Sequence, residues 1–353
     1  MNAASGHGRT LFLLALLLVA AMVVCAGVGA YAFSPARMLD LLAQATGLAP
    51  AADADAIERN VFITLRLPRV LLAALTGATL GVCGAAMQGL FRNPIVEPGL
   101  VGTSAGAAFG AALVFVLGVP LFAPAGGLGL IALPLFAFLG ALGATALTLQ
   151  IASAFGRVHV FTLLLAGIAV NALCAAGTGF LSFVARDPQA RNITFWSLGT
   201  FTTASWRSVM LVAAAFVIGF IVITRDARAL NALMLGEDEA ASLGVAPAAL
   251  TRRLLTLNTL MVAVATAAVG VIAFVGLVVP HALRLLKSSN HAFLIPGAAL
   301  LGATFAVVVD AVARVVIAPA ELPIGILTAV VGAPVFLLLL LSFQRAGRTG
   351  AHG

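Results

Sequence analysis

One uncharged run gives the clearest information about the architecture of this chain: it follows Arg69 and reads Val70-Leu-Leu-Ala-Ala-Leu-Thr-Gly-Ala-Thr-Leu-Gly-Val-Cys-Gly-Ala-Ala-Met-Gln-Gly-Leu-Phe91. A helix needs about 20 apolar residues to cross the roughly 30 Å hydrocarbon core of a bilayer. The run from Val70 to Phe91 meets this requirement, so it predicts a membrane-spanning helix. Similar runs recur along the rest of the sequence.

The composition extends this conclusion to the whole chain. Of 353 residues, 62% are hydrophobic and only 9% are charged, and the mean hydropathy is +1.15. Soluble domains use roughly 45–50% apolar and 25% charged residues, so the few charges here are too sparse to cover a soluble surface. We therefore expect residues 1–353 to form a single all-α, polytopic transmembrane domain.

Charged or Pro- and Gly-rich clusters separate ten candidate spans. The ten expected spans are residues 11–33, 69–91, 99–119, 128–155, 160–184, 206–224, 254–272, 273–285, 294–312 and 323–343. The seventh and eighth are hard to separate around Gly270, and the eighth is unusually short.

Ten spans place both termini on one side of the membrane, and the distribution of cations indicates which side. With the N-terminus in the cytoplasm, eleven of the 19 Lys and Arg residues lie on the inner side. Cytoplasmic loops carry an excess of these residues, so we expect an N-in, C-in subunit. The basic character of the chain then reflects topology and contact with anionic lipids, and nothing in the sequence indicates a nucleic-acid partner.

Several enzyme classes are excluded by single residues. The chain has one lysine, Lys287, in the stretch Arg284-Leu-Leu-Lys-Ser-Ser. Neither of the two glycines that a P-loop of the form Gly-x-x-x-x-Gly-Lys-Ser/Thr requires before its lysine is present there. Any ATP-Mg must therefore be bound by a partner, and we expect no cofactor on this subunit. Cys25, Cys83 and Cys174 stand singly in apolar runs, so their spacing predicts neither a metal site nor a disulfide.

An ion-coupled secondary carrier is one alternative. Such carriers usually need carboxylates, His or Lys deep in the bilayer, where these groups are costly. Here Asp310 lies near the end of a span and Glu97 lies in a loop after Pro94. A proton relay is poorly supported by this pattern, so the energy for transport is expected to come from a partner.

An intramembrane serine hydrolase is a second alternative, because Gly102-Thr-Ser-Ala-Gly106 matches Gly-x-Ser-x-Gly. Such an enzyme needs a histidine base, and His281 is the only candidate near a span. Glycines at this spacing, like Gly77 and Gly81, also allow two helix backbones to approach closely in lipid. We favour helix packing for both pairs of glycines.

The longest hydrophilic segment on the inner side covers residues 225–253. Within it, Leu235-Gly-Glu-Asp-Glu-Ala-Ala-Ser-Leu-Gly244 predicts a short amphipathic helix that ends at Gly244. A solvated loop helix is the simpler interpretation. A helix that projects from a membrane protein without an energy source of its own also suits docking of a cytosolic motor.

Three arginines lie at the outer ends of spans. Arg66-Leu-Pro-Arg69 stands at the mouth of the second span, and Arg314 follows the ninth. We expect Pro68 to stiffen this segment and to keep it from joining the helix. Snorkelling at the interface is the simple interpretation, but three fixed outward guanidinium groups would suit carboxylates on an external protein.

Taken together, the motifs resemble the FecCD-type permease subunits of type II ABC importers, which take up iron–siderophore complexes, haem and vitamin B12. The resemblance covers about residues 60–343. The matching stretches are Arg66-Leu-Pro-Arg69, Met87-Gln-Gly-Leu-Phe-Arg-Asn-Pro-Ile-Val-Glu-Pro-Gly99, Leu163-Leu-Leu-Ala-Gly167, Leu235-Gly-Glu to Leu243-Gly244, Phe274-Val-Gly-Leu-Val-Val-Pro-His281, Glu321-Leu-Pro-Ile-Gly325 and Gly332-Ala-Pro334.

The resemblance implies a homodimer in the bacterial inner membrane, with the substrate path on the dimer axis. Two copies of a cytosolic ABC ATPase would bind below it, and a periplasmic binding protein would dock above it through Arg66, Arg69 and Arg314. The contact with the ATPase would involve Leu235, Gly236, Glu237, Asp238, Glu239, Leu243 and Gly244.

The resemblance also implies an inner gate. The family's gate uses the Asn of an Asn-Pro pair, here Asn93, with the side chain two residues later, here Ile95. A second gate segment corresponds to residues 157–161, including His159 and Val160. These residues differ from the small hydroxyl residues of the family's vitamin B12 permease.

The ligand is indicated by one outer segment, residues 186–199, which resembles the corresponding segment of haem permeases. Arg186 and Arg191 suit the propionates of haem, and Phe195 and Trp196 suit its flat apolar face. An ordinary interfacial belt of Trp and Arg is the alternative interpretation. We rank haem first, a ferric siderophore second and cobalamin third as the imported ligand.

Two further histidines invite a role as iron ligands. His281 and His291 have counterparts in the vitamin B12 permease of the family, which has no need to bind haem. We therefore expect a structural role for both near the cytoplasmic side, and we predict no metal site.

Overall fold

The computed structural model describes residues 2–29, 31–50, 56–118, 128–153 and 160–349, and it describes only the backbone at 2–5, 128–130, 160 and 339–349. The described residues form helices, turns and loops, without a β-strand. The all-α class expected from the sequence is therefore confirmed.

Within the described residues, ten apolar helical runs correspond one by one to the ten expected spans. Seven are long enough to cross a bilayer: Gly6–Gly27, Ala56–Leu90, Ile131–Ser153, Phe161–Val184, Trp206–Arg225, Pro247–Val269 and His291–Val315. Three are shorter: Thr103–Gly118, Val275–Leu286 and Ile324–Leu338.

These runs belong to named helices, and two of the runs also include a π-helical segment beside the α-helix. The helices are α1 (Asn2–Gly27), α4 (Leu67–Leu90), α5 (Thr103–Leu113), α7 (Leu128–Ser153), α8 (Val160–Val184), α10 (Trp206–Arg225), α13 (Pro247–Val269), α14 (Val275–Leu286), α15 (His291–Val315) and α16 (Ile324–Thr349). Shorter connecting helices are α2 (Pro35–Ala45), α3 (Ala56–Asn60), α9 (Asp187–Ser197), α11 (Ala227–Leu233) and α12 (Glu237–Ser242).

The second span begins earlier than the sequence predicts, because helix continues through Pro68. A π-helical segment, η2 (Val61–Arg66), joins α3 to α4 without a break, and Pro68 occupies the first turn of α4. Proline lacks the N–H that an α-helix needs, but it is tolerated in a first turn and beside a widened π turn. The expectation that Pro68 keeps the segment out of helix is therefore wrong.

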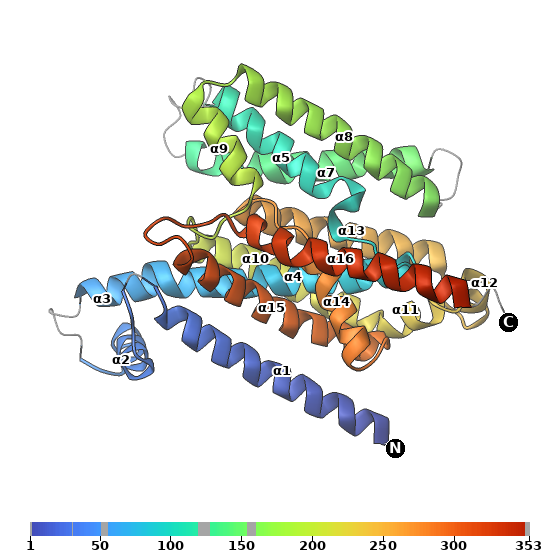
Figure 1. Cartoon of the computed structure of the whole chain (residues 1–353), viewed down its shortest axis with the longest axis horizontal. Coiled ribbons are helices and arrows are strands. Elements are labelled where there is room, and N and C mark those ends of the chain that lie inside the picture. The colour runs from blue at the N-terminus through green and yellow to red at the C-terminus, as the bar shows by residue number, and fades with distance from the viewer. Residues whose placement is uncertain (1, 30, 51–55, 119–127, 154–159, 350–353) are drawn as a thin grey trace.

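The helix α4 lies at the centre of the molecule, where 89% of its most apolar window is buried. It packs along α15, and a Cβ atom at Gly77 would lie 2.2 Å from the carbonyl oxygen of Gly302. The helices α5, α7 and α8 form a second layer above it (Figure 1), in which Gly106 meets the backbone of Gly140 in the same way. Both glycine pairs thus serve close helix packing, as expected.

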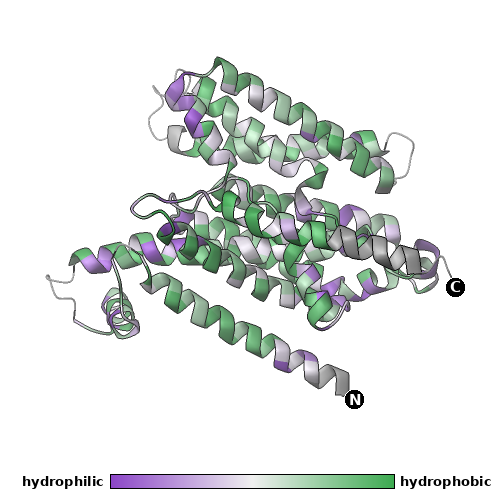
Figure 2. Ribbon diagram, in the orientation of Figure 1, coloured by the Kyte–Doolittle hydropathy of each residue, from purple (hydrophilic) through white to green (hydrophobic). Residues whose placement is uncertain are grey.

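The two ends of the bundle differ in their chain connections. The N-terminal end of α1 and the C-terminal end of α16 lie on the same side, with α11 and α12, whereas α2, α3 and α9 lie on the opposite side (Figure 1). Hydrophilic residues gather at these two ends, and the helices between them are mostly apolar (Figure 2). We call the side of the termini the inner end, following the positive-inside assignment.

The seventh and eighth spans are two halves of a broken helix. The helix α13 ends at Val269, and Gly270 and Phe274 adopt positive φ angles of 80° and 67° before α14 begins. The Phe274 N–H donates to a carboxylate oxygen of Glu97 at 2.8 Å. Broken helices at membrane depth need such partners, because no water satisfies their free backbone groups.

Candidate functional site

A cluster of five charged side chains occupies the outer end of the bundle, and we call Arg66, Arg69, Asp310, Arg314 and Glu321 the outer cluster. Arg69 forms a fork on Asp310, with its Nε 3.1 Å from both carboxylate oxygens and a terminal nitrogen 2.9 Å from one of them. The same guanidinium lies 2.9 Å from a carboxylate oxygen of Glu321. Arg314 Nε lies 3.3 Å from Asp310.

Two arginines of this cluster, Arg66 and Arg314, also bind backbone oxygens at the end of α1 and just after it. Arg314 donates to the carbonyl oxygens of Cys25 at 2.8 Å and Val28 at 2.9 Å. Arg66 donates to the oxygen of Val28 and, at 3.2 Å, to that of Tyr31. The last carbonyls of a helix lack intrahelical partners and carry partial negative charge, so cations stabilise them.

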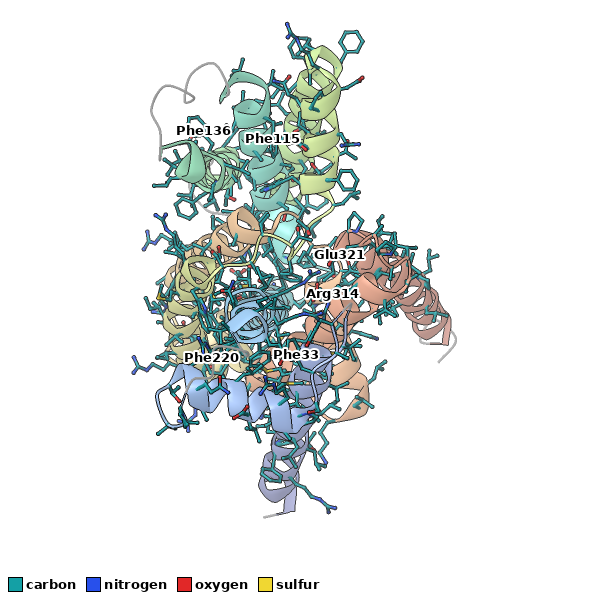
Figure 3. The ribbon with its side chains drawn as sticks, turned by 90° about the vertical axis from the view of Figure 1, so that its left-hand side faces the viewer. Phe33, Phe115, Phe136, Phe220, Arg314 and Glu321 are labelled. Carbon is teal, nitrogen blue, oxygen red and sulfur yellow. The ribbon has the colours of Figure 1, made fainter. Side chains whose placement is uncertain are left out.

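The structure places the three arginines together, but it turns two of them inward. Arg314 is only 9% exposed, and Arg69 is held between two carboxylates. The expectation of three outward-facing arginines is therefore wrong for Arg69 and Arg314. Figure 3 looks onto this end and shows Arg314 and Glu321 close together.

Sequence reasoning missed Asp310 and Glu321 as partners of these arginines. One signal was available, because Asp310 and Arg314 stand four residues apart in a span, which places them on the same helix face. The pairing of Arg69 with Asp310, by contrast, joins residues 241 positions apart and leaves no local pattern.

The inner end carries the acidic helix α12, which confirms the short helix expected before Gly244. Its carboxylates at Glu237, Asp238 and Glu239 are all exposed, and Ala240 is fully buried against the protein. Gly244 follows the helix with a φ of 83°, the conformation that favours glycine.

Two leucines flank α12 and remain open to solvent. Leu235 is 68% exposed and Leu243 is 65% exposed. The preceding helix α11 is anchored by the buried side chains of Leu230 and Leu233, so the flanking leucines stand on a fixed support. Apolar side chains beside three carboxylates form a surface suited to a protein partner.

The residues expected at the inner gate are described in part. The Asn93 side-chain oxygen accepts a hydrogen bond from Ile95 N at 3.0 Å, which closes a tight turn after α4. Arg92, immediately before it, has a positive φ of 50°. His159 and the side chain of Val160 lie outside the described residues.

The outer segment proposed to contact ligand forms the helix α9. Arg186 and Arg191 are exposed, and Phe195 is 51% exposed. Trp196 differs, because its ring is partly buried against a cluster that includes Ala263 and Ala267 of α13. Trp196 therefore helps to fix α9 to the bundle, and the two arginines and Phe195 remain accessible.

His291 and the Gly-x-Ser-x-Gly stretch take part in contacts between helices. His291 Nδ1 lies 2.8 Å from the side-chain oxygen of Asn231, which links the start of α15 to α11. Gly106 and Gly110 pack on the backbone of α7, so the glycines around Ser104 belong to a helix contact. Within the described residues, no group of three or more His, Cys, Asp or Glu side chains is arranged to hold a metal.

Comparison with known proteins agrees with this arrangement. The hemin transport system permease protein of Yersinia pestis is 42% identical over 294 residues, which cover 82% of this chain and 86% of that protein. The molybdate import system permease protein of Haemophilus influenzae is 36% identical, and the match covers 97% of this chain and 98% of that protein. The vitamin B12 import system permease protein of Salmonella typhi is 41% identical, and the match covers 88% of this chain and 92% of that protein.

A solved structure and a family profile support the same assignment. The structure is an inward-facing conformation of a metal-chelate type ABC transporter, with 33% identity and a TM-score of 0.81 over 95% of this chain and 99% of that one. The profile of the FecCD transport family matches residues 16–342. The chain therefore belongs to the FecCD transport family and is a multi-pass permease of the ABC importer type.

Proposed function

We propose that this permease imports haem, or another iron complex, from the periplasm to the cytoplasm. The observation that carries the proposal is the outer helix α9, whose exposed Arg186, Arg191 and Phe195 combine two cations with an aromatic ring. Haem offers two carboxylates and a flat apolar face to such a surface. The likeness to a hemin permease supports the same ligand.

A ferric siderophore and cobalamin are the second and third candidates. Relatives named for vitamin B12 and molybdate are of similar identity, so likeness alone does not rank the ligands. The ranking rests on the chemistry of α9, because a pair of arginines favours a ligand with separate anionic groups. Cobalamin has a large surface with fewer anionic groups, and it gains less from that pair.

Permeases of this family work with an ATPase and a substrate-binding protein. For this chain we propose a homodimer in the bacterial inner membrane that carries two ATPase subunits, which bind ATP-Mg. The acidic helix α12 with Leu235 and Leu243 would bind the ATPase. Arg66, the arginine of the outer cluster that pairs with no carboxylate in the described residues, would lie at the contact with the binding protein. Asn93 and Ile95 would form part of the inner gate.

The surroundings of Asp310 favour an external energy source. A proton-coupled carrier needs a carboxylate that gains and loses a proton during transport. Asp310 is paired with both Arg69 and Arg314. The Glu97 carboxylate accepts a hydrogen bond from the backbone N–H of Phe274. Both carboxylates therefore have structural partners, which favours transport driven by ATP.

The proposal is tested by uptake into proteoliposomes that contain the permease with its ATPase and binding protein. ATP is enclosed, and haem, a ferric siderophore, cobalamin and molybdate are compared. We expect ATP-dependent accumulation of haem. Accumulation of molybdate or cobalamin without haem would overturn the ligand assignment, and uptake driven by a proton gradient without the ATPase would overturn the ABC mechanism.

Substitutions in α9 sharpen the test. Arg186→Ala with Arg191→Ala should raise the KM for haem while leaving ATP hydrolysis stimulated by the binding protein unchanged. Arg207→Ala is a matched control, because this exposed arginine stands at the outer start of α10. An equal change in both variants would remove α9 from the ligand path.

A further inference from the structure

Two exposed cations stand at the inner end of the bundle without a carboxylate partner. Arg9 lies on α1, and Lys287 follows the last turn of α14. Among the residues that the structure describes, neither forms an ion pair, in contrast to Arg253, which binds Asp226 at 2.5 Å. The positive charge at this position is therefore left for a partner outside the chain.

The packing of α1 brings these two cations to one surface. The His7 ring stacks on Phe293 of α15, with the ring centroids 4.9 Å apart. A Cβ atom at Gly6 would lie 3.2 Å from Lys287 Nζ, so the ammonium group touches the first turns of α1. Arg9 is three residues after Gly6 and shares its side of the helix.

Apolar surface adjoins the two cations. Leu285 and Leu286, at the end of α14, are each 75% exposed. The helix α1 lies at the edge of the bundle (Figure 1), and only 11% of its apolar window is buried. A soluble partner cannot cover this face, since α1 runs along it through the depth of the bilayer.

We propose that Arg9 and Lys287, with Leu285 and Leu286, form a binding site for an anionic phospholipid, which we call the inner lipid site. The headgroup phosphate lies between the two cations, and the acyl chains follow the exposed face of α1. The arrangement of these side chains matches that of a lipid, because the positive charges lie at the level of the headgroup and the apolar side chains lie directly beside them.

The site is tested by native mass spectrometry of the full permease, exchanged from nanodiscs that contain phosphatidylglycerol and phosphatidylethanolamine with identical acyl chains. The measured quantity is the ratio of the two bound lipids. Arg9→Gln with Lys287→Gln should lower the preference for phosphatidylglycerol by about 30-fold, since each cation near the surface contributes about a fivefold preference.

A matched control removes the same charge elsewhere on the inner side. Arg228 and Arg252 are exposed there, on α11 and α13, and neither is ion-paired within the described part of the chain. Arg228→Gln with Arg252→Gln should leave the ratio within about twofold of the parent. An equal loss in both double variants would reduce the effect to general electrostatics and overturn the site.

A further arm separates a lipid from a free anion. Inorganic phosphate is added at millimolar concentration to the parent protein before the lipid ratio is measured. We expect no change, because the exposed leucines and α1 contribute binding only to a molecule with acyl chains. Displacement of phosphatidylglycerol by phosphate alone would show a simple anion site and overturn the proposal.

Discussion

The charged side chains at the two ends of this permease differ in whether they are paired within the chain. At the outer end, Asp310 pairs with Arg69 and Arg314 inside the chain, and Arg314 also binds the end of α1. At the inner end, Glu237 and its neighbours on α12 stand in solvent beside exposed leucines. The charges of the outer cluster thus hold the fold together, whereas those of α12 remain available to a partner.

The largest effect is expected from Asp310→Ala, which removes the carboxylate paired with the buried Arg314 and leaves Arg69 with Glu321 alone. Removing one partner of a buried ion pair costs roughly 3–5 kcal/mol, because the remaining charge is uncompensated. Thermal unfolding of the permease in detergent measures the change. Asp187→Ala, at an exposed position on α9, is the control and should change stability by less than about 0.5 kcal/mol. Equal stability of the two variants would contradict a structural role for the outer cluster.

The next largest effect is expected at the leucines beside α12. Leu235→Ser with Leu243→Ser should weaken assembly with the ATPase by about 3 kcal/mol, because each leucine buried at an interface contributes roughly 1.5–3 kcal/mol. Pull-down of the ATPase at graded concentrations measures this change. Leu48, which is 85% exposed and follows α2 at the outer end, provides the control in Leu48→Ser. Unchanged assembly would exclude this surface as the contact.

A smaller effect is expected from the carboxylates of α12. Alanine at Glu237, Asp238 and Glu239 should leave thermal stability unchanged, since all three side chains are exposed. Uptake per ATP hydrolysed should fall, because charged groups at the rim of an interface set its register and contribute about 1 kcal/mol each or less. Normal coupling in proteoliposomes would remove these residues from the ATPase contact.

The smallest effect is expected from Arg66→Glu. This side chain binds backbone oxygens and no carboxylate in the described residues, so its reversal disturbs the outer cluster less than a change at Arg69. Binding-protein affinity should fall about fivefold at low salt and less at high salt, as expected for a partly exposed charge. An affinity independent of both the substitution and the salt concentration would sink the docking assignment of Arg66.

Much of the fold could be predicted from the sequence because membrane insertion is governed by local hydrophobicity and length. All ten expected spans have a helical counterpart, and the break at Gly270 lies where the pattern is ambiguous. The errors are at the boundaries. The first span ends at Gly27 rather than 33, and the second begins at Ala56, ahead of Pro68. Both errors concern residues whose conformation depends on neighbouring helices.

Of the two candidate surfaces, α12 could be predicted from the sequence and the outer cluster could not. The helix before Gly244 follows from local signals, namely acidic residues in a first turn and a glycine after the last. The outer cluster does not, because Arg69 and Asp310 meet only when α4 packs along α15. A sequence motif identified the arginines, but burial and pairing determine which of them can reach a partner.

The sequence by itself determined the membrane class, the positions of the apolar helices, the amphipathic helix α12 and the family, because each depends on composition or on residues close together in the chain. Only the tertiary structure decided that Asp310 pairs with two arginines, that Glu97 binds the broken helix at Phe274, and that Lys287 lies against the first turns of α1. The physical reason is the same in each case. In a bilayer, buried charges and free backbone groups must find partners within the protein, and helix packing decides which distant residues those partners are.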